Sequence, residues 1–171
     1  MFARIKRLLK HRWMDDASRS VAPEVSQRLT RRVAASEQQH SGQIRICVEA
    51  ALPNSYLLRQ DSIRAITRQR AVAQFGKLRV WDTQHNHGVL IYLLLAERAI
   101  ELVADRGLNQ YVTPEQWQAM VQSLGLTLSE GRFEDGLTRA LEEVTELLVA
   151  HFPLAEGEAS VNELPDKPAI L

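Results

Sequence analysis

Two apolar runs in the middle of the chain are flanked by side chains of the types that bind divalent cations. The runs are Val89–Leu95 and Ala99–Ala104. The candidate ligands stand just before the first run and just after the second: Asp82, Asn86, His87 and Asp105. Carboxylate and amide oxygens suit Ca²⁺ or Mg²⁺, whereas an inward-facing His87 would shift the preference towards Mn²⁺ or Zn²⁺. We therefore predict a polar site that could hold a cation, with ion pairing to Arg106 as the structural alternative.

The elements that must position these residues are two strands. Val89–Leu95 carries no charge and is typical of a strand covered on both faces, and the three residues before Ala99–Ala104 suggest a hairpin. In an antiparallel pair, the start of the first strand and the end of the second lie at the same edge. This geometry predicts that Asn86 and His87 approach Asp105.

A third strand and a crossover helix precede the hairpin. Gln43–Ala51 alternates polar and apolar residues, which predicts a half-covered or edge-like strand. Ser55–Phe75 follows with helical spacing, and a strand, helix and strand in succession form a parallel crossover by default. The chain is therefore of the α/β class, with a parallel β-α-β crossover followed by an antiparallel hairpin.

The remaining pattern predicts three further helices and three regions of the chain. One helix begins at Pro23, one begins at the capping sequence from Thr113, and one spans Phe133–Phe152. Pro153 stops the last helix, and the acidic residues beyond it lack apolar periodicity. We divide the chain into a basic amphipathic segment (1–20), a folded domain (21–153) and an acidic, flexible tail (154–171).

Composition narrows the classes of function. Lys plus Arg equals Asp plus Glu at 21 each, so the net charge does not favour nucleic acid as a partner. The single Cys47 cannot form an internal disulfide, and residues 1–20 lack the apolar core of a secretory signal, which together predict a cytoplasmic protein. Residues 1–14 could lie on a membrane surface, or they could pack on the domain or on a second subunit.

Three segments resemble the TPM-domain family over roughly Val21–Phe152. They are Asn86-His87-Gly88-Val89-Leu90-Ile91, the strand with Glu101 that leads to Gly107-Leu108, and Arg132-Phe133-Glu134-Asp135-Gly136-Leu137. Their order and spacing carry the resemblance. His87 stands where the family commonly has a second asparagine, and Arg132 replaces the first acid of the last segment.

The resemblance implies an α/β/α sandwich around a small mixed sheet, with a surface groove that binds divalent cations. It adds Glu134 to the candidate ligands, and it implies the acid phosphatase activity attributed to some plant relatives. In that reaction a metal would activate water, and Arg106 or Arg132 would hold the phosphate.

Two classes of function therefore remain open. The favoured one is a non-catalytic binding module that holds a protein partner or forms a homo-oligomer. The alternative is a metal-dependent phosphatase, although the sequence contains no glycine-rich phosphate loop, no Cys-x5-Arg motif and no GxSxG elbow that would mark a nucleophile or phosphate site.

Overall fold

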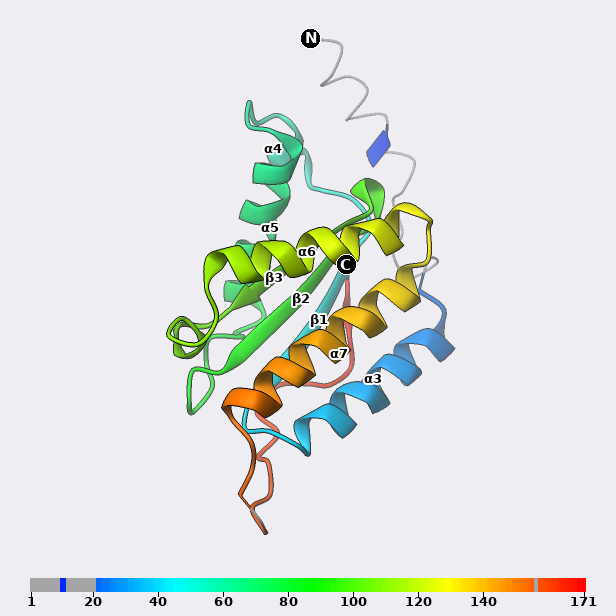
Figure 1. Cartoon of the computed structure of the whole chain (residues 1–171). Coiled ribbons are helices and arrows are strands. Elements are labelled where there is room, and N and C mark those ends of the chain that lie inside the picture. The colour runs from blue at the N-terminus through cyan, green and yellow to red at the C-terminus, as the bar shows by residue number, and fades with distance from the viewer. Residues whose placement is uncertain (1–9, 12–20, 156) are drawn as a thin grey trace.

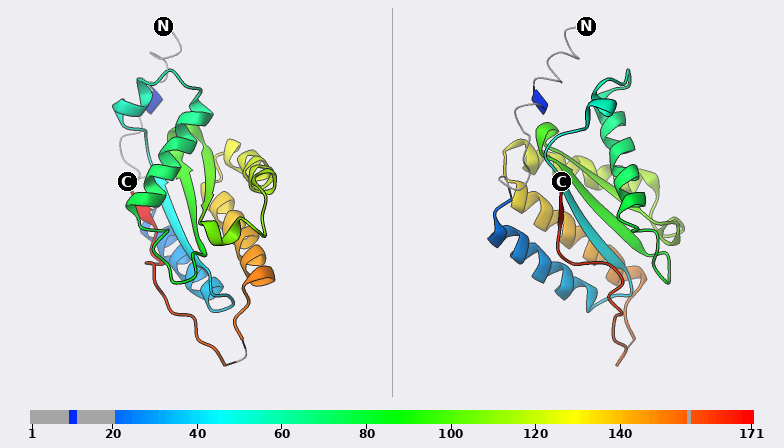
Figure 2. Two further views of the ribbon diagram at one scale, coloured as in Figure 1. Left: turned by 90° about the vertical axis from the view of Figure 1, so that its left-hand side faces the viewer. Right: turned by 180° about the vertical axis from the view of Figure 1, so that it is seen from behind.

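A four-stranded sheet lies between two layers of helices in the computed structural model, which describes residues 10–11, 21–155 and 157–171 (Figure 1). The elements in chain order are α3 (Pro23–Glu37), β1 (Gln43–Glu49), α4 (Asn54–Leu57), α5 (Ile63–Lys77), β2 (Gly88–Leu94), η1 (Leu95–Glu97), β3 (Ala99–Ala104), η2 (Arg106–Leu108), α6 (Pro114–Ser129), α7 (Phe133–His151) and β4 (Ala169–Ile170). Helices α3, α6 and α7 cover one face of the sheet, and α5 covers the other (Figure 2). The expected α/β/α sandwich is confirmed.

The strand order β3-β2-β1-β4 contains both of the predicted connections. β1 and β2 are parallel, with Gln43 opposite Gly88, and α5 makes the crossover between them. β2 and β3 are antiparallel, with Val89 opposite Ala104. The short helix η1 forms the hairpin turn. Arg98 ends this helix in the left-handed region at φ 49°, and its backbone N–H donates to the Leu95 carbonyl.

β1 differs from the prediction, because it is an interior strand that is buried along its whole length. Its polar residues find partners inside the protein rather than in solvent. The Glu49 carboxylate accepts hydrogen bonds from Arg70 (2.9 Å to Nε) and from the Tyr92 hydroxyl (2.7 Å). The Arg45 guanidinium donates to the backbone carbonyls of Pro165 and Lys167. A polar strand face can therefore be buried when its charged groups are ion-paired or hydrogen-bonded.

The C-terminal region returns to the sheet, whereas the sequence predicts a flexible tail for residues 154–171. β4 pairs in parallel with β1, and it places Ala169 opposite the buried Cys47. Leu164 is buried, and its N–H donates to the Gln43 side chain at 3.1 Å. Backbone hydrogen bonds and one buried leucine fix this segment on the sheet, and neither of these leaves a periodic pattern in the sequence.

The start of the chain is described only at Lys10 and His11. Lys10 Nζ and His11 Nε2 lie 2.7 and 2.8 Å from the Glu97 carboxylate, and the Leu52 N–H donates to His11 Nδ1 at 3.0 Å. These two residues therefore contact the domain, while the rest of the predicted basic segment (1–20) lies outside the described residues. Within the described part of the chain, no helix has the length and hydropathy needed to cross a membrane.

Candidate functional site

The predicted meeting of two loops is present at one end of the sheet. The Asp105 N–H donates to the Gly88 carbonyl at 2.9 Å, and the Gly107 N–H donates to the Asn86 carbonyl at 3.1 Å. The Gln43 N–H donates to the His87 carbonyl at 3.2 Å, which ties the start of β1 to the same place. The loop before β2 and the loop after β3 therefore form one backbone-bonded unit, and we call residues 82–88 with residues 105–109 the paired loops.

Two glycines and one asparagine allow close backbone approaches in the paired loops. A Cβ on Gly88 would lie 1.9 Å from the Val80 carbonyl oxygen, and a Cβ on Gly107 would lie 2.5 Å from the Asn86 carbonyl oxygen. Asn86 itself adopts the left-handed region at φ 56°, which asparagine tolerates better than most residues. The local backbone is therefore built for contact between the loops.

Three polar atoms in the paired loops are buried without a hydrogen-bond partner within the structure. They are Thr83 Oγ1, His87 Nδ1 and Asp105 Oδ2. The other Asp105 oxygen is satisfied, since it accepts the Arg106 N–H at 2.7 Å. An unsatisfied buried polar atom costs about 1–3 kcal/mol, so three such atoms in the paired loops call for an explanation by water or by an ion.

Arg106 lies at the edge of this region and presents its guanidinium to Asn86. Its Nη2 and Nε donate to Asn86 Oδ1 at 3.1 and 3.3 Å. The Arg106 side chain is exposed, so an anion could reach it from solvent. Of the seven candidate residues, the structure thus brings Asn86, His87, Asp105 and Arg106 together.

Aromatic rings form a wall beside the paired loops. The His87 ring stacks on Phe152 with centroids 3.7 Å apart, and Tyr111 meets Phe152 edge-on at 5.0 Å. Burial and the neighbouring His85 ring lower the pKa of His87, although Asp105 acts in the opposite direction. The lowered pKa favours the neutral imidazole, which is the form that can coordinate a metal.

Asp82 lies in the loop before β2, and its carboxylate is not among the buried atoms without a partner. Its side chain is half exposed and is 3.9 Å from Arg79. The sequence pattern did not predict Thr83, Tyr111 or Phe152 as parts of the site. The predicted helix end at Phe152 and Pro153 was the one feature of the sequence that could have indicated the aromatic wall.

Glu134 and Arg132 belong to a different part of the molecule. Glu134 stands in the first turn of α7 and pairs with Arg28 of α3 at 2.6 Å, an interaction that lowers the pKa of Glu134. α7 rises about 1.5 Å per residue, so Glu134 lies roughly 27 Å along the helix from Phe152. Glu134 cannot share an ion with Asp105. Arg132 is held by Glu130 at 2.6 Å and by Asp135 at 3.4 Å.

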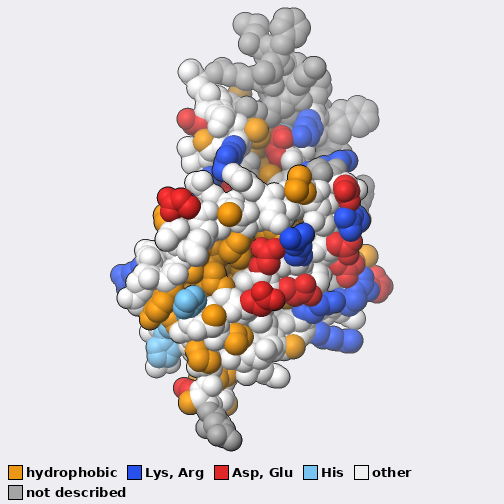
Figure 3. Space-filling view, in the orientation of Figure 1, with side chains coloured by type: hydrophobic (Ala, Val, Ile, Leu, Met, Phe, Trp, Pro, Cys, Tyr) orange, Lys and Arg blue, Asp and Glu red, His pale blue; other side chains and the backbone are white. Residues whose placement is uncertain are grey.

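The surface view separates these two regions. Acidic and basic side chains gather over α3 and α7, whereas histidines lie among hydrophobic side chains near the end of the molecule where α7 ends (Figure 3). Among the described residues, no group of three or more His, Cys, Asp or Glu side chains could hold a metal ion. Any cation at the paired loops would therefore depend on Asp105, His87 and Thr83 together with backbone or water oxygens.

Comparisons with known proteins agree on the fold. A family model for the TPM domain matches residues 14–147. The solution structure of BA42 protein from the psychrophilic bacterium Bizionia argentinensis is similar at a TM-score of 0.69 and 23% identity, covering 87% of this chain and 94% of that one. The N-terminal domain of a P. gingivalis protein is similar at a TM-score of 0.55 and 17% identity, covering 77% and 78%. No match is found among curated proteins.

Proposed function

Since this chain belongs to the TPM domain family, we propose that it is an interaction module in which the paired loops bind a divalent cation. The observation that supports this proposal is the set of three buried, unpartnered polar atoms on Thr83, His87 and Asp105. A cation would offset the cost of leaving these atoms unsatisfied. Hydroxyl and carboxylate oxygens favour Ca²⁺ or Mg²⁺, and a ligating His87 would favour Mn²⁺ or Zn²⁺.

Calorimetric titration of chelator-treated protein with each of the four cations tests this proposal. Asp105→Asn should weaken saturable binding by about tenfold or more, since it removes the charge of the only carboxylate with an unsatisfied buried oxygen in the paired loops. Asp82→Asn is the matched control, because it makes the same change in the other of the paired loops at a half-exposed side chain. Equal binding by both variants, or heat no different from buffer, would leave water as the occupant and refute the cation site.

A second candidate function is supported by the position of Arg106. Its exposed guanidinium stands beside Asn86 and could hold a phosphate ester while a cation at Asp105 activates water. This hydrolase would turn over a simple aryl phosphate, and turnover would be lost in Arg106→Gln, in Asp105→Asn and in chelator. The interaction module predicts no turnover above that of the Asp105→Asn protein.

The proposal also includes a protein partner or a homo-oligomer and a cytoplasmic location. The single buried Cys47 is compatible with a reducing compartment. Cell fractionation of the full chain would test the location, and light scattering across a range of protein concentrations would test self-association.

A further inference from the structure

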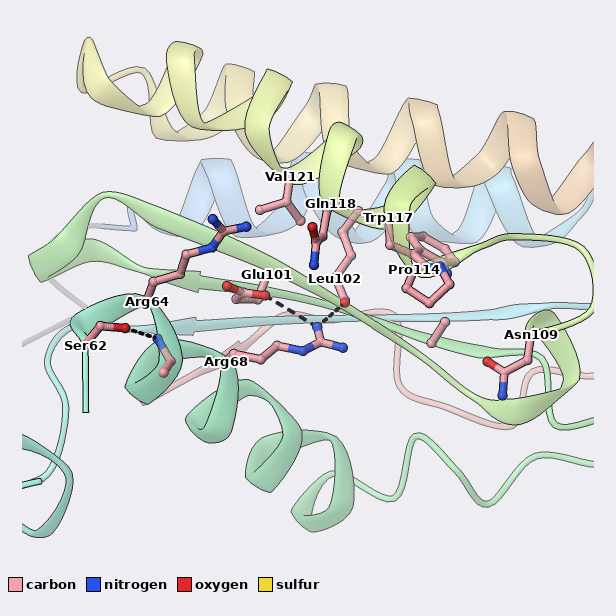
Figure 4. Close-up of a pocket in the computed structure, with 12 residues that line it drawn as sticks. Ser62, Arg64, Arg68, Glu101, Leu102, Asn109, Pro114, Trp117, Gln118 and Val121 are labelled. Carbon is pink, nitrogen blue, oxygen red and sulfur yellow. Dashed lines mark hydrogen bonds and ion pairs between the residues drawn. The ribbon is translucent and has the colours of Figure 1, made fainter. Parts of the chain in front are cut away.

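A groove follows the outer edge of β3 and reaches the paired loops at Asn109. One hollow of about 550 Å³ lies between α5 and α6, and a second of about 260 Å³ continues along the same strand towards Ala99. Both hollows include Arg64, Glu101 and Val121 in their walls. Figure 4 shows the larger hollow, with Arg64 projecting from α5 and Val121 and Trp117 from α6. The two hollows together therefore run the length of the strand.

The outer edge of β3 has no strand partner among the described residues at this groove. Ile100 and Leu102 are only 2% and 1% exposed, so the side chains that cover this edge must move aside before another strand can pair with it. β3 stands at the end of the strand order, and no strand of the described chain pairs with its outer side. The hydrogen bond from the Asp105 N–H to the Gly88 carbonyl fixes the alternation of the ladder, so the amides of Ile100, Leu102 and Ala104 point away from β2. An edge of this kind is a template for another strand.

One of these outward groups has a replaceable partner. The Leu102 carbonyl accepts a hydrogen bond from the Arg68 guanidinium, which also lies 3.4 Å from a Glu101 carboxylate oxygen (Figure 4). Arg68 is half exposed, so it can move out without disturbing the core. An incoming peptide amide could take its place on the Leu102 carbonyl.

The side chains of the groove favour an acidic ligand. In the larger hollow, two guanidinium groups, on Arg64 and Arg68, face a single carboxylate, on Glu101. The Glu97 carboxylate at the smaller hollow is paired with Lys10 and His11. Arg64 acts on Glu101 only through its charge, with no hydrogen bond between them. If Arg68 swings out to make room, both cations become available to the ligand, while Trp117 and Val121 offer apolar surface.

We propose that this groove binds an extended acidic segment of a partner protein, which adds to β3 as a fifth strand. Its backbone would bond to the outward amides and carbonyls of β3. Its carboxylates would pair with Arg64 and Arg68, and its alternate apolar side chains would pack against Trp117. This inference rests on the proposed interaction role but not on the cation, because Thr83, His87 and Asp105 do not line the groove.

Fluorescence anisotropy in excess chelator tests the groove apart from the cation site. The probe is a labelled eight-residue peptide that alternates valine with glutamate. The matched peptides carry lysine in place of glutamate, or N-methyl groups on alternate amides. We expect the acidic peptide to bind saturably and each matched peptide to bind with an affinity lower by about tenfold or more. The lysine peptide loses charge complementarity, and the N-methylated peptide loses ladder hydrogen bonds.

Two charge-reversal variants test whether the acidic peptide binds at this groove. Arg64→Glu should weaken binding of the acidic peptide by about tenfold, whereas Arg31→Glu on the exposed side of α3 should leave it unchanged. Equal affinity for the N-methylated peptide, an equal effect of the two reversals, or no saturable binding would each overturn the proposal. Because chelator is present throughout, failure here leaves the cation titration unaffected.

Discussion

Glu37→Gln should remove a pH-dependent loss of stability from the end of α3. Glu37 is only 4% exposed, and one of its carboxylate oxygens accepts the Ile44 N–H at 2.7 Å while the other is buried without a partner in the structure. Burial raises the pKa of Glu37 from 4.5 to about 7, opposed by the hydrogen bond from Ile44 and aided by the charge of Asp166. The folded state therefore holds its proton more tightly than the unfolded state.

The sign and size of the effect follow from this difference. As pH rises from 4.5 through 7, the unfolded chain releases the proton first, so the free energy of unfolding falls. The difference between the two pKa values, at about 1.4 kcal/mol for each pKa unit, corresponds to about 3 kcal/mol at pH 8. The glutamine variant cannot ionise and escapes this loss.

Urea unfolding of both proteins at pH 4 and at pH 8 measures the effect. The stability of Glu37→Gln relative to the parent should rise by about 3 kcal/mol between these pH values, and titrations common to both proteins, such as that of buried His40, cancel in the difference. Glu142→Gln provides the control, since the Glu142 side chain is 61% exposed. A relative stability that stays constant within about 0.5 kcal/mol would refute a raised pKa at Glu37.

Three further changes test the core and the sheet by urea unfolding. Tyr92→Phe removes the hydroxyl that donates to buried Glu49, so the free energy of unfolding should fall by about 1–3 kcal/mol; no change would mean that the bond is dispensable. Gly88→Ala places a Cβ 1.9 Å from a backbone oxygen and should cost about 2 kcal/mol or more, whereas Gly76→Ala in open space on α5 should gain up to about 1 kcal/mol. Deletion of residues 169–171 removes β4 and should lower stability by about 1–3 kcal/mol, whereas a flexible tail would leave stability unchanged.

Local pattern was sufficient to predict the centre of the sheet. The uncharged run of β2 and the short spacing to β3 specify a hairpin without reference to the rest of the chain. The predicted environment of β1 was wrong, because alternation of polar and apolar residues cannot distinguish a solvent-exposed face from one with buried partners such as Arg70. β4 was missed because two residues are too few to show a period, and its partner strand is about 120 residues away in sequence.

The same distinction applies to the candidate site. Asn86, His87 and Asp105 stand at strand ends, so strand pairing alone predicts that they meet, and the structure brings them together. Glu134 was added by family resemblance, but α7 fixes it at the far end of the helix, where Arg28 holds it. The length of α7 sets the distance between Glu134 and the paired loops, and a short sequence motif contains no information about that distance.

Cys47 gives the protein a built-in reporter of local opening. It is the only cysteine in the chain, its side chain is fully buried on β1, and burial raises its pKa to about 12. In the folded state, a labelling reagent therefore cannot reach the Cys47 thiol, and that thiol is not present as the reactive thiolate. β4 lies on one side of Cys47 and Tyr92 of β2 on the other, so alkylation must wait until part of the sheet opens. The rate of labelling under native conditions would then measure how often the C-terminal strand detaches relative to complete unfolding.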